Sequence, residues 1–229
     1  MSQYTGTATL EVMQEAINYN NYLLHLIQSN TKIGDKILDF GSGIGTFAVL
    51  MKEKGFDVSC LEPDTELLRR IKNKGLTGFL DLSEIPNNKY DFIYSLNVFE
   101  HIKDEQDAMV KLREKLKPSG RVFIYVPAFQ ILYSSMDRKV GHYRRYTLSG
   151  LAEIVKKAGF KILDAQYVDS IGFFAALIFK LFGNQDGDVN KKGLILFDKF
   201  VFPVSKIVDW FTKKIFGKNV FVVATRGYE

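Results

Sequence analysis

The chain has 229 residues, with 31 Lys and Arg against 26 Asp and Glu and with apolar side chains at 46% of its positions. This apolar content excludes a disordered chain, and the single cysteine excludes an internal disulfide and a cysteine-rich metal site. The N-terminus lacks the basic-then-apolar pattern of a signal peptide, and no apolar run is long enough to span a bilayer. We therefore expect a cytoplasmic protein with a single domain over residues 1–229.

Short apolar runs alternate with helical patterns along the chain. A helix is predicted over residues 7–29, and residues 1–32 as a whole are expected to form a helical lid. Strands are predicted over residues 36–40, 57–62, 76–82, 90–97, 121–126, 160–169 and 219–226, and helices over residues 46–54, 65–74, 104–116 and 148–158. Alternation of this kind predicts a Rossmann-like, doubly wound α/β sheet with helices on both faces.

A glycine-rich loop, Asp39-Phe40-Gly41-Ser42-Gly43-Ile44-Gly45, lies between the first predicted strand and the next helix. Glycines let the backbone turn sharply and approach a ligand closely, and the strand–loop–helix context favours ligand binding over a purely structural turn. Glu62 follows Gly41 by 21 residues, at the end of the next strand, where a carboxylate can accept both ribose hydroxyls. Asp39 suits a ligand that carries an ammonium group and would repel a pyrophosphate.

A third acidic residue, Asp81, ends the third predicted strand. It could accept a hydrogen bond from an adenine amine, with Leu82 against the ring, although a turn-capping role is the alternative. Acidic residues at three successive strand ends fit an adenosine joined to a cationic amino acid.

These motifs, together with the segment Tyr90–Ile102, resemble the class I S-adenosylmethionine-dependent methyltransferases. The resemblance implies a seven-stranded, mainly parallel sheet whose last strand is antiparallel, and S-adenosylmethionine as cofactor. It also implies that Asp39 and the glycine loop contact the methionine part, that Glu62 takes the ribose and Asp81 the adenine side, and that the segment after strand four lies near the transferable methyl. The cofactor-binding residues expected from the resemblance are Asp39, Gly41, Ser42, Gly43, Glu62, Pro63, Asp81, Leu82, Asn97 and Val98.

Two further stretches are similar to a bacterial branch of that family. One is Tyr19-Asn20 in the N-terminal helix, where Tyr19 is expected to cover the cofactor. The other is Gly-His-Tyr-Arg-Arg-Tyr at residues 141–146, in the long connection 127–147 that borders the acceptor pocket in this fold.

Methyl transfer to a protonated nucleophile needs a base, and histidine is the first candidate near neutral pH. Of the three histidines, His25 is expected to be structural, while His101 and His142 are alternative catalytic bases. Packing at the start of a helix is the competing interpretation for His101. The adjacent pair Glu100-His101 could contact a metal, but two neighbouring ligands are a weak signal, and we expect no metal site.

The loop residues Tyr143, Arg144, Arg145 and Tyr146 are predicted to bind the substrate, because paired arginines can hold a carboxylate or phosphate in a bidentate manner. The alternative is a solvated loop whose arginines pair with acids such as Asp137.

Residues 170–218 are predicted to form a helical insertion between the last two strands. This segment carries eight Lys, four Asp and nine of the 19 Phe, so nearly all of the net charge of +5 lies here. One polar face is expected to carry Lys206, Asp209 and Lys213. Another face is expected to carry an apolar stripe, with residues every three or four positions: Phe197, Val201, Val204, Val208, Phe211 and Ile215. The insertion could cap the acceptor pocket, dimerise, or lie on an anionic membrane.

Together these features predict a methyltransferase that acts on a small-molecule or lipid-linked anionic acceptor, at oxygen, with peripheral binding to the inner membrane face as an option. A nucleic-acid methyltransferase is one alternative, disfavoured because the surplus charge is confined to an apolar insertion. A non-catalytic, cofactor-binding membrane adaptor is the other.

Overall fold

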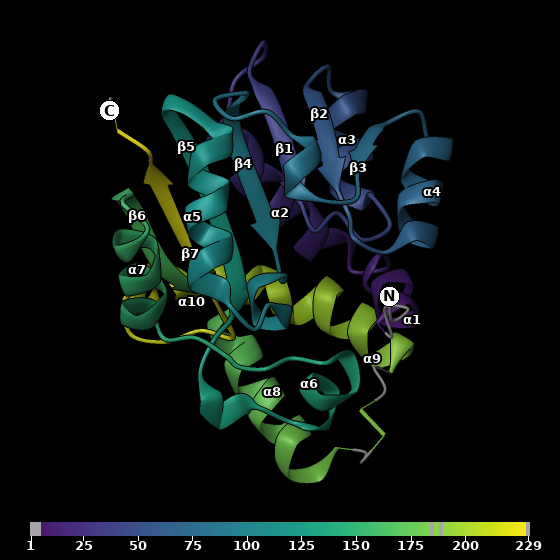
Figure 1. Cartoon of the computed structure of the whole chain (residues 1–229). Coiled ribbons are helices and arrows are strands. Elements are labelled where there is room, and N and C mark those ends of the chain that lie inside the picture. The colour runs from purple at the N-terminus through teal and green to yellow at the C-terminus, as the bar shows by residue number, and fades with distance from the viewer. Residues whose placement is uncertain (1–5, 184–185, 188–189, 228–229) are drawn as a thin grey trace.

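The computed structural model describes residues 6–183, 186–187 and 190–227. Its seven strands form one sheet in the order β3-β2-β1-β4-β5-β7-β6, in which β7 runs antiparallel to both of its neighbours (Figure 1). The strands are β1 (Lys36–Phe40), β2 (Asp57–Leu61), β3 (Thr77–Phe79), β4 (Tyr90–Leu96), β5 (Leu116–Pro127), β6 (Lys161–Val168) and β7 (Asn219–Thr225). The predicted fold class, including the antiparallel last strand, is confirmed.

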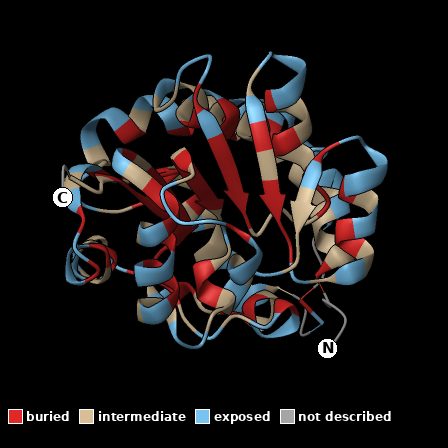
Figure 2. Cartoon of the chain, turned by 45° about the horizontal axis from the view of Figure 1, so that its top comes forward, coloured by how far each residue is buried: buried red, intermediate tan, exposed pale blue. Residues whose placement is uncertain are grey.

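Helices cover both faces of the sheet, and each face has its own apolar core. One core joins the strands to α5 (Glu105–Lys115) and α7 (Leu148–Lys157). The other joins them to α2 (Ile17–Ser29), α3 (Thr46–Glu53) and α4 (Thr65–Asn73). Figure 2 shows the buried strands in red between these two helical layers. A sheet buried on both faces explains why its strands read as continuous apolar runs in the sequence.

The predicted helix over residues 7–29 is broken in two, as α1 (Thr7–Met13) and α2. The side-chain amide of Asn20 donates to the backbone carbonyl of Met13 at 2.9 Å and closes the end of α1. Asp198, far away in the chain, accepts the backbone N–H groups of Asn18 (2.9 Å) and Tyr19 (2.8 Å) and caps the start of α2. The break therefore depends on a tertiary contact that the local pattern does not contain.

Two other boundaries differ from the prediction. Strand β3 stops at Phe79, and Asp81 instead caps the short helix η1 (Leu82–Glu84). Strand β5 begins at Leu116, directly after α5, because Leu116 pairs with Tyr90 ahead of a register shift. The connection after β5 is not a plain loop, since it contains η3 (Gln130–Leu132) and α6 (Ser135–Val140).

The insertion forms α8 (Ser170–Phe182), α9 (Lys191–Leu196), a π-helical turn η4 (Phe197–Val201) and α10 (Phe202–Thr212). Helix α10 packs on α8, β6 and α2. Among the residues that the structure describes, no helix is long and apolar enough to cross a membrane.

The face that α10 and η4 turn toward the protein is largely polar, and it consists of Asp198, Phe202, Ser205 and Asp209. Asp209 accepts the backbone N–H groups of Asp169 and Ser170, each at 2.8 Å, and so caps the start of α8. The expectation that Asp209 shares an exposed polar face with Lys213 is therefore wrong. The predicted apolar stripe is not the buried face either, because Val204, Phe211 and Ile215 are exposed.

Candidate active site

A cavity of 330 Å³ opens at the edge of the sheet where the parallel strands end. Its walls come from the segments that follow β1, β2, β4 and β5, from the start of β7, and from α1, α2 and α6. Because β7 is antiparallel, its first residues lie at the same edge as the carboxyl ends of its neighbours. Ligands of open α/β sheets bind at this edge.

The glycine loop forms the cavity wall after β1. Gly41 and Gly43 have φ of 78° and 54°, a region that side chains with Cβ disfavour. A Cβ at Gly41 would also overlap the side chain of Val98, so this position has room only for glycine. Ser42 lines the cavity as well, and its hydroxyl donates to the carbonyl of Asp39 at 2.9 Å.

Asp39 lies at the bottom of this wall, with 4% of its surface exposed. Burial, reinforced by the charge of Glu62, raises the pKa of Asp39 to about 7. A carboxyl group in this state gains most from a cationic ligand, because the ligand's charge would stabilise the ionised form.

Glu62, directly after β2, closes the glycine loop from the opposite side. Its carboxylate accepts the backbone N–H groups of Gly43 (2.7 Å) and Asp64 (3.0 Å), one on each oxygen. Burial raises the pKa of Glu62, although these two hydrogen bonds act in the other direction. Each oxygen retains acceptor capacity on the cavity side, where Pro63 also contributes to the wall.

Helices α1 and α2 cover the glycine loop from above, through residues such as Leu10, Met13, Tyr19 and Asn20. Leu10 lies directly against Gly43. The hydroxyl of Tyr19 donates to that of Tyr125 at 3.2 Å, which fixes the position of the Tyr19 ring in the cavity wall.

Asn97 and Val98 follow β4 in the middle of the cavity. Asn97 has a left-handed backbone with φ of 53°, and its N–H donates to the carbonyl of Tyr125 at 2.8 Å. Strained backbone of this kind persists where the surrounding structure holds it, often beside a binding site.

Asp81 and Leu82, in contrast, do not line the cavity. The carboxylate of Asp81 is exposed. Hydrogen bonds from the hydroxyl of Ser83 and from its backbone N–H, the latter at 2.8 Å, lower the pKa of Asp81. Leu82 packs against the core beneath. Their contact with adenine stays a prediction.

At the far end of the cavity, His142 forms a buried chain of interactions with Asp137 and Arg145. His142 Nδ1 lies 2.7 Å from Asp137 Oδ1, and Arg145 binds both oxygens of Asp137 at 2.8 and 2.9 Å. These partners hold the pKa of Asp137 well below its usual range, despite burial. An ionised carboxylate only accepts hydrogen bonds, so Nδ1 of His142 is the nitrogen that donates to Asp137, and in the neutral imidazole Nε2 carries the lone pair.

Glu100 and His101 adjoin this chain. His142 Nε2 is 3.8 Å from Glu100 Oε1. The rings of His101 and His142 pack edge to face, with their centroids 4.6 Å apart. Burial raises the pKa of Glu100 to about 8, whereas burial and the neighbouring His142 lower the pKa of His101 to about 4. His101 is thus neutral and a weak base at neutral pH.

The donor atoms of Glu100, His101 and His142 lie within 4.8 Å of one another. One carboxylate and two imidazoles form a donor set that zinc and similar divalent cations accept, and the Asp137 contact would orient His142 for that role as well. The same groups serve equally as an acid–base set.

The remaining loop residues lie outside the cavity or are committed to other partners. Tyr143 is exposed, Arg144 pairs with Glu105 at 2.8 Å, and the hydroxyl of Tyr146 donates to Glu105. Arg145 lines the cavity, but its guanidinium is engaged by Asp137. Both arginines therefore pair with acids, as the alternative interpretation of this loop expected, but the Arg145–Asp137 pair is buried and not solvated. His25, also outside the cavity, is exposed.

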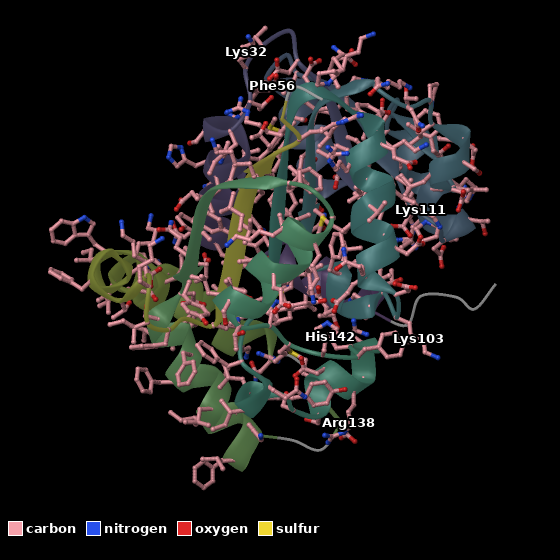
Figure 3. The ribbon with its side chains drawn as sticks, turned by 60° about the vertical axis from the view of Figure 1, so that its left-hand side comes forward. Lys32, Phe56, Lys103, Lys111, Arg138 and His142 are labelled. Atoms are coloured by element: carbon pink, nitrogen blue, oxygen red, sulfur yellow. The ribbon has the colours of Figure 1, made fainter. Side chains whose placement is uncertain are left out.

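Sequence reasoning missed several residues at this end, among them Met136, Val140, Lys218 and Asn219. Asn219 is buried, and its side-chain nitrogen has no hydrogen-bond partner among the described residues. The expected antiparallel direction of the last strand already placed its first residues at the ligand-binding edge. Figure 3 shows His142 near that edge, on the segment that also carries Arg138.

Comparisons with known proteins agree with this site. The family model described as "Methyltransferase domain" matches residues 13–165. A ubiquinone biosynthesis O-methyltransferase of Rickettsia bellii is 32% identical over 114 residues, covering 45% of this chain and 48% of the relative. An uncharacterized methyltransferase of Staphylococcus carnosus is 30% identical over 122 residues, covering 50% of this chain and 56% of the relative. The chain thus spans about half the length of these curated relatives.

Solved structures share the fold over most of the chain. A SAM-dependent methyltransferase from Archaeoglobus fulgidus aligns with a TM-score of 0.63 and 15% identity, over 92% of this chain and 94% of the other. Phosphoethanolamine N-methyltransferase 2 of Haemonchus contortus, in complex with S-adenosyl-L-methionine, aligns with a TM-score of 0.61 and 22% identity, over 92% of this chain and 52% of the other. With the family match and the cavity taken together, the chain belongs to the methyltransferase-domain family, among the class I S-adenosylmethionine-dependent methyltransferases.

Proposed function

We propose that the protein transfers the methyl group of S-adenosylmethionine to an oxygen of a small or lipid-linked acceptor that carries an acidic group. The observation that carries the proposal is the His142–Asp137 pair, which lies at the end of the cavity away from the glycine loop. The similarity to a ubiquinone biosynthesis O-methyltransferase supports an oxygen acceptor.

In this proposal the cofactor occupies the β1–β2–β4 end of the cavity. The carboxylate of Asp39 attracts the ammonium group, and the glycine loop contacts the amino-acid part. Glu62 accepts the ribose hydroxyls, because its two oxygens keep acceptor capacity on the cavity side. Tyr19 would cover the bound cofactor, and Asn97 and Val98 would line the cavity beside its methyl group.

The chemistry at the other end is an in-line displacement. The acceptor oxygen forms a bond to the methyl carbon while the carbon–sulfur bond breaks, and the sulfonium becomes a neutral thioether. The hydroxyl proton passes to Nε2 of His142, which carries the lone pair because Nδ1 is held protonated by Asp137. The negative charge of Asp137 stabilises the resulting imidazolium, and Arg145 keeps Asp137 in place.

Lys218 and Asn219 orient the acidic group of the acceptor in this scheme. They contribute a cation and an amide donor to the acceptor end, and the Asn219 nitrogen has no other partner among the described residues. Arg144 and Arg145 are less suited to this role, because both already bind carboxylates.

The test is transfer of a labelled methyl group from S-adenosylmethionine into extracts of lipids, small molecules and RNA, followed by identification of the product. We expect label in a small or lipid product, as an ether or ester, and loss of transfer in His142→Ala. The control is His25→Ala, which removes an exposed histidine of α2 and should leave transfer intact. Label in RNA, or full activity of His142→Ala, would overturn the proposal.

The donor set of Glu100, His101 and His142 calls for a second arm of the same assay. Transfer that resists chelation supports the acid–base scheme. Transfer that is lost with a chelator and restored by a divalent cation would replace His142 as base with a metal-bound acceptor.

A further inference from the structure

The insertion helices present their apolar side chains to solvent. Among the described residues, 18 large apolar side chains are exposed, and 12 of these lie between Phe174 and Ile215. The most exposed of the 12 are Leu181, Phe182, Ile207, Trp210, Phe211 and Ile215, at 64% to 82%. We refer to these six side chains, together with Lys199, Lys206 and Lys213, as the apolar face. A patch of this kind on a single chain indicates an interaction surface.

The apolar face is a consequence of how the helices are docked. Asp198 and Asp209 point inward to cap α2 and α8, and Ser205 donates to Asp169 at 3.0 Å. Because these polar contacts fix the orientation of η4 and α10, the apolar positions between them must face outward. The arrangement is thus built into the fold and does not depend on a choice of side-chain rotamers.

The two outward faces adjoin each other. Helix α10 packs on α8, and Phe174 of α8 contacts Phe216, next to Ile215, with ring centroids 5.7 Å apart. In Figure 3, side chains with aromatic rings extend from α8 and α10 toward the same outer side of the molecule, away from the sheet.

The exposed charged side chains of the insertion helices themselves have one sign. The only acidic residues of α8, α9, η4 and α10 are Asp198 and Asp209, and both are buried. Lys199 lies beside Phe200, with its ammonium 5.4 Å from the ring centroid, and Lys206 and Lys213 lie one helical turn before and after Trp210. The exposed surface of these helices therefore combines large apolar side chains with lysines alone.

We propose that this apolar face binds the surface of an anionic phospholipid bilayer, with α8 and α10 lying in the interface. Aromatic and aliphatic side chains enter the acyl boundary, and the lysines contact the lipid phosphates. The charge pattern favours this partner over a second copy of the chain, because a face-to-face dimer would oppose two sets of lysines. No described helix could span the bilayer, which agrees with binding in the interface.

The apolar face also adjoins the acceptor end of the cavity. Lys180 of α8 donates to the carbonyl of Ile131 at 2.6 Å, in the segment between β5 and α6 that leads to Met136 and Val140 in the cavity wall. Bilayer binding would hold this end of the cavity near the membrane. The inference itself does not depend on which acceptor is methylated.

The single tryptophan makes the test direct, because Trp210 lies in the apolar face and is the only indole fluorophore of the chain. The full-length protein is mixed with vesicles of phosphatidylcholine alone, or of phosphatidylcholine with phosphatidylglycerol, and is followed by flotation and by fluorescence. We expect flotation and a blue shift with the anionic vesicles, both weakened by salt.

Two sets of variants locate the contact. Ile207→Ser with Phe211→Ser, which keeps Trp210, should abolish flotation, and Lys206→Gln with Lys213→Gln should weaken it about fivefold for each lysine. The matched control is Lys32→Gln with Ile33→Ser, an exposed lysine and isoleucine at the opposite end of the molecule, where Figure 3 labels Lys32. Circular dichroism and S-adenosylmethionine binding confirm that every variant is folded.

Three results would overturn the inference. The first is no flotation with anionic vesicles, and the second is flotation that the control variant loses as fully as the apolar-face variant. The third is self-association in sedimentation that Ile207→Ser with Phe211→Ser removes while vesicles have no effect, which would make the apolar face a contact between copies. Loss of methyl transfer without loss of flotation would affect only the proposed function.

Discussion

The two ends of the cavity are built in different ways. At the proposed cofactor end, backbone conformation and backbone hydrogen bonds shape the cavity wall, because Gly41 and Gly43 have left-handed φ values and Glu62 is held by two backbone N–H groups. At the other end, side chains from the single connection between β5 and α7 form a largely buried hydrogen-bonded chain, His142–Asp137–Arg145. In the proposed function, the first end holds the cofactor and the second positions the reacting groups.

Removing the base should give the largest effect at the acceptor end. His142→Ala is expected to lower kcat by about 10²–10⁴, the range for a lost general base, while the Kd for S-adenosylmethionine is unchanged. The measurement is methyl transfer at saturating cofactor. An equal loss in His25→Ala would show that the effect is not specific to this site.

Breaking the ion pair between Asp137 and Arg145 tests whether these residues also stabilise the fold. Asp137→Ala leaves the guanidinium of Arg145 buried without its carboxylate, so the free energy of unfolding should fall by about 3–5 kcal/mol. Chemical denaturation measures the change. The exposed pair Lys157–Glu153 is the control, and Glu153→Ala should leave the free energy of unfolding nearly unchanged. Equal effects of the two substitutions would contradict the account.

The wall of the cavity beside β1 and β2 was predictable because its residues follow one another in a short motif, Asp39 to Gly45, with Glu62 at the next strand end. At the other end of the cavity, His142 and the pairing of the loop arginines with Asp137 were foreseen as alternatives, whereas Lys218 and Asn219 were missed because only the tertiary fold brings the start of β7 to this place. The break between α1 and α2 has the same origin, since Asp198 caps α2 across 180 positions. The orientation of α10 was missed because its buried face is polar, and hydrophobic periodicity cannot identify such a face.

A methyl group added at the glycine loop should weaken cofactor binding without removing the fold. Gly41→Ala combines a left-handed φ of 78° with overlap on Val98, and we expect a loss of affinity for S-adenosylmethionine of about tenfold or more. Gly55→Ala is the matched control, because its φ is 86° and nothing lies within 4 Å of the added atom. Calorimetry should show weaker binding only for the first variant.

The last expected effect is a pH dependence of cofactor binding, which changes gradually and needs no substitution. The pKa of Asp39 is raised to about 7, so the carboxyl is neutral below that pH and attracts the ammonium group only above it. The affinity for S-adenosylmethionine should therefore rise by up to about tenfold per pH unit between pH 5 and 7 and then level off. Asp39→Asn should flatten this profile, and a profile that falls with rising pH would contradict the assignment.

The most direct test of the division between the two ends is calorimetric titration of S-adenosylmethionine into three proteins at pH 8. The account predicts binding by the unchanged protein, equal binding by His142→Ala, and an affinity lower by about tenfold to a hundredfold in Glu62→Ala, where a charged hydrogen-bond acceptor is lost. No binding by the unchanged protein, or the same loss in both variants, would contradict it.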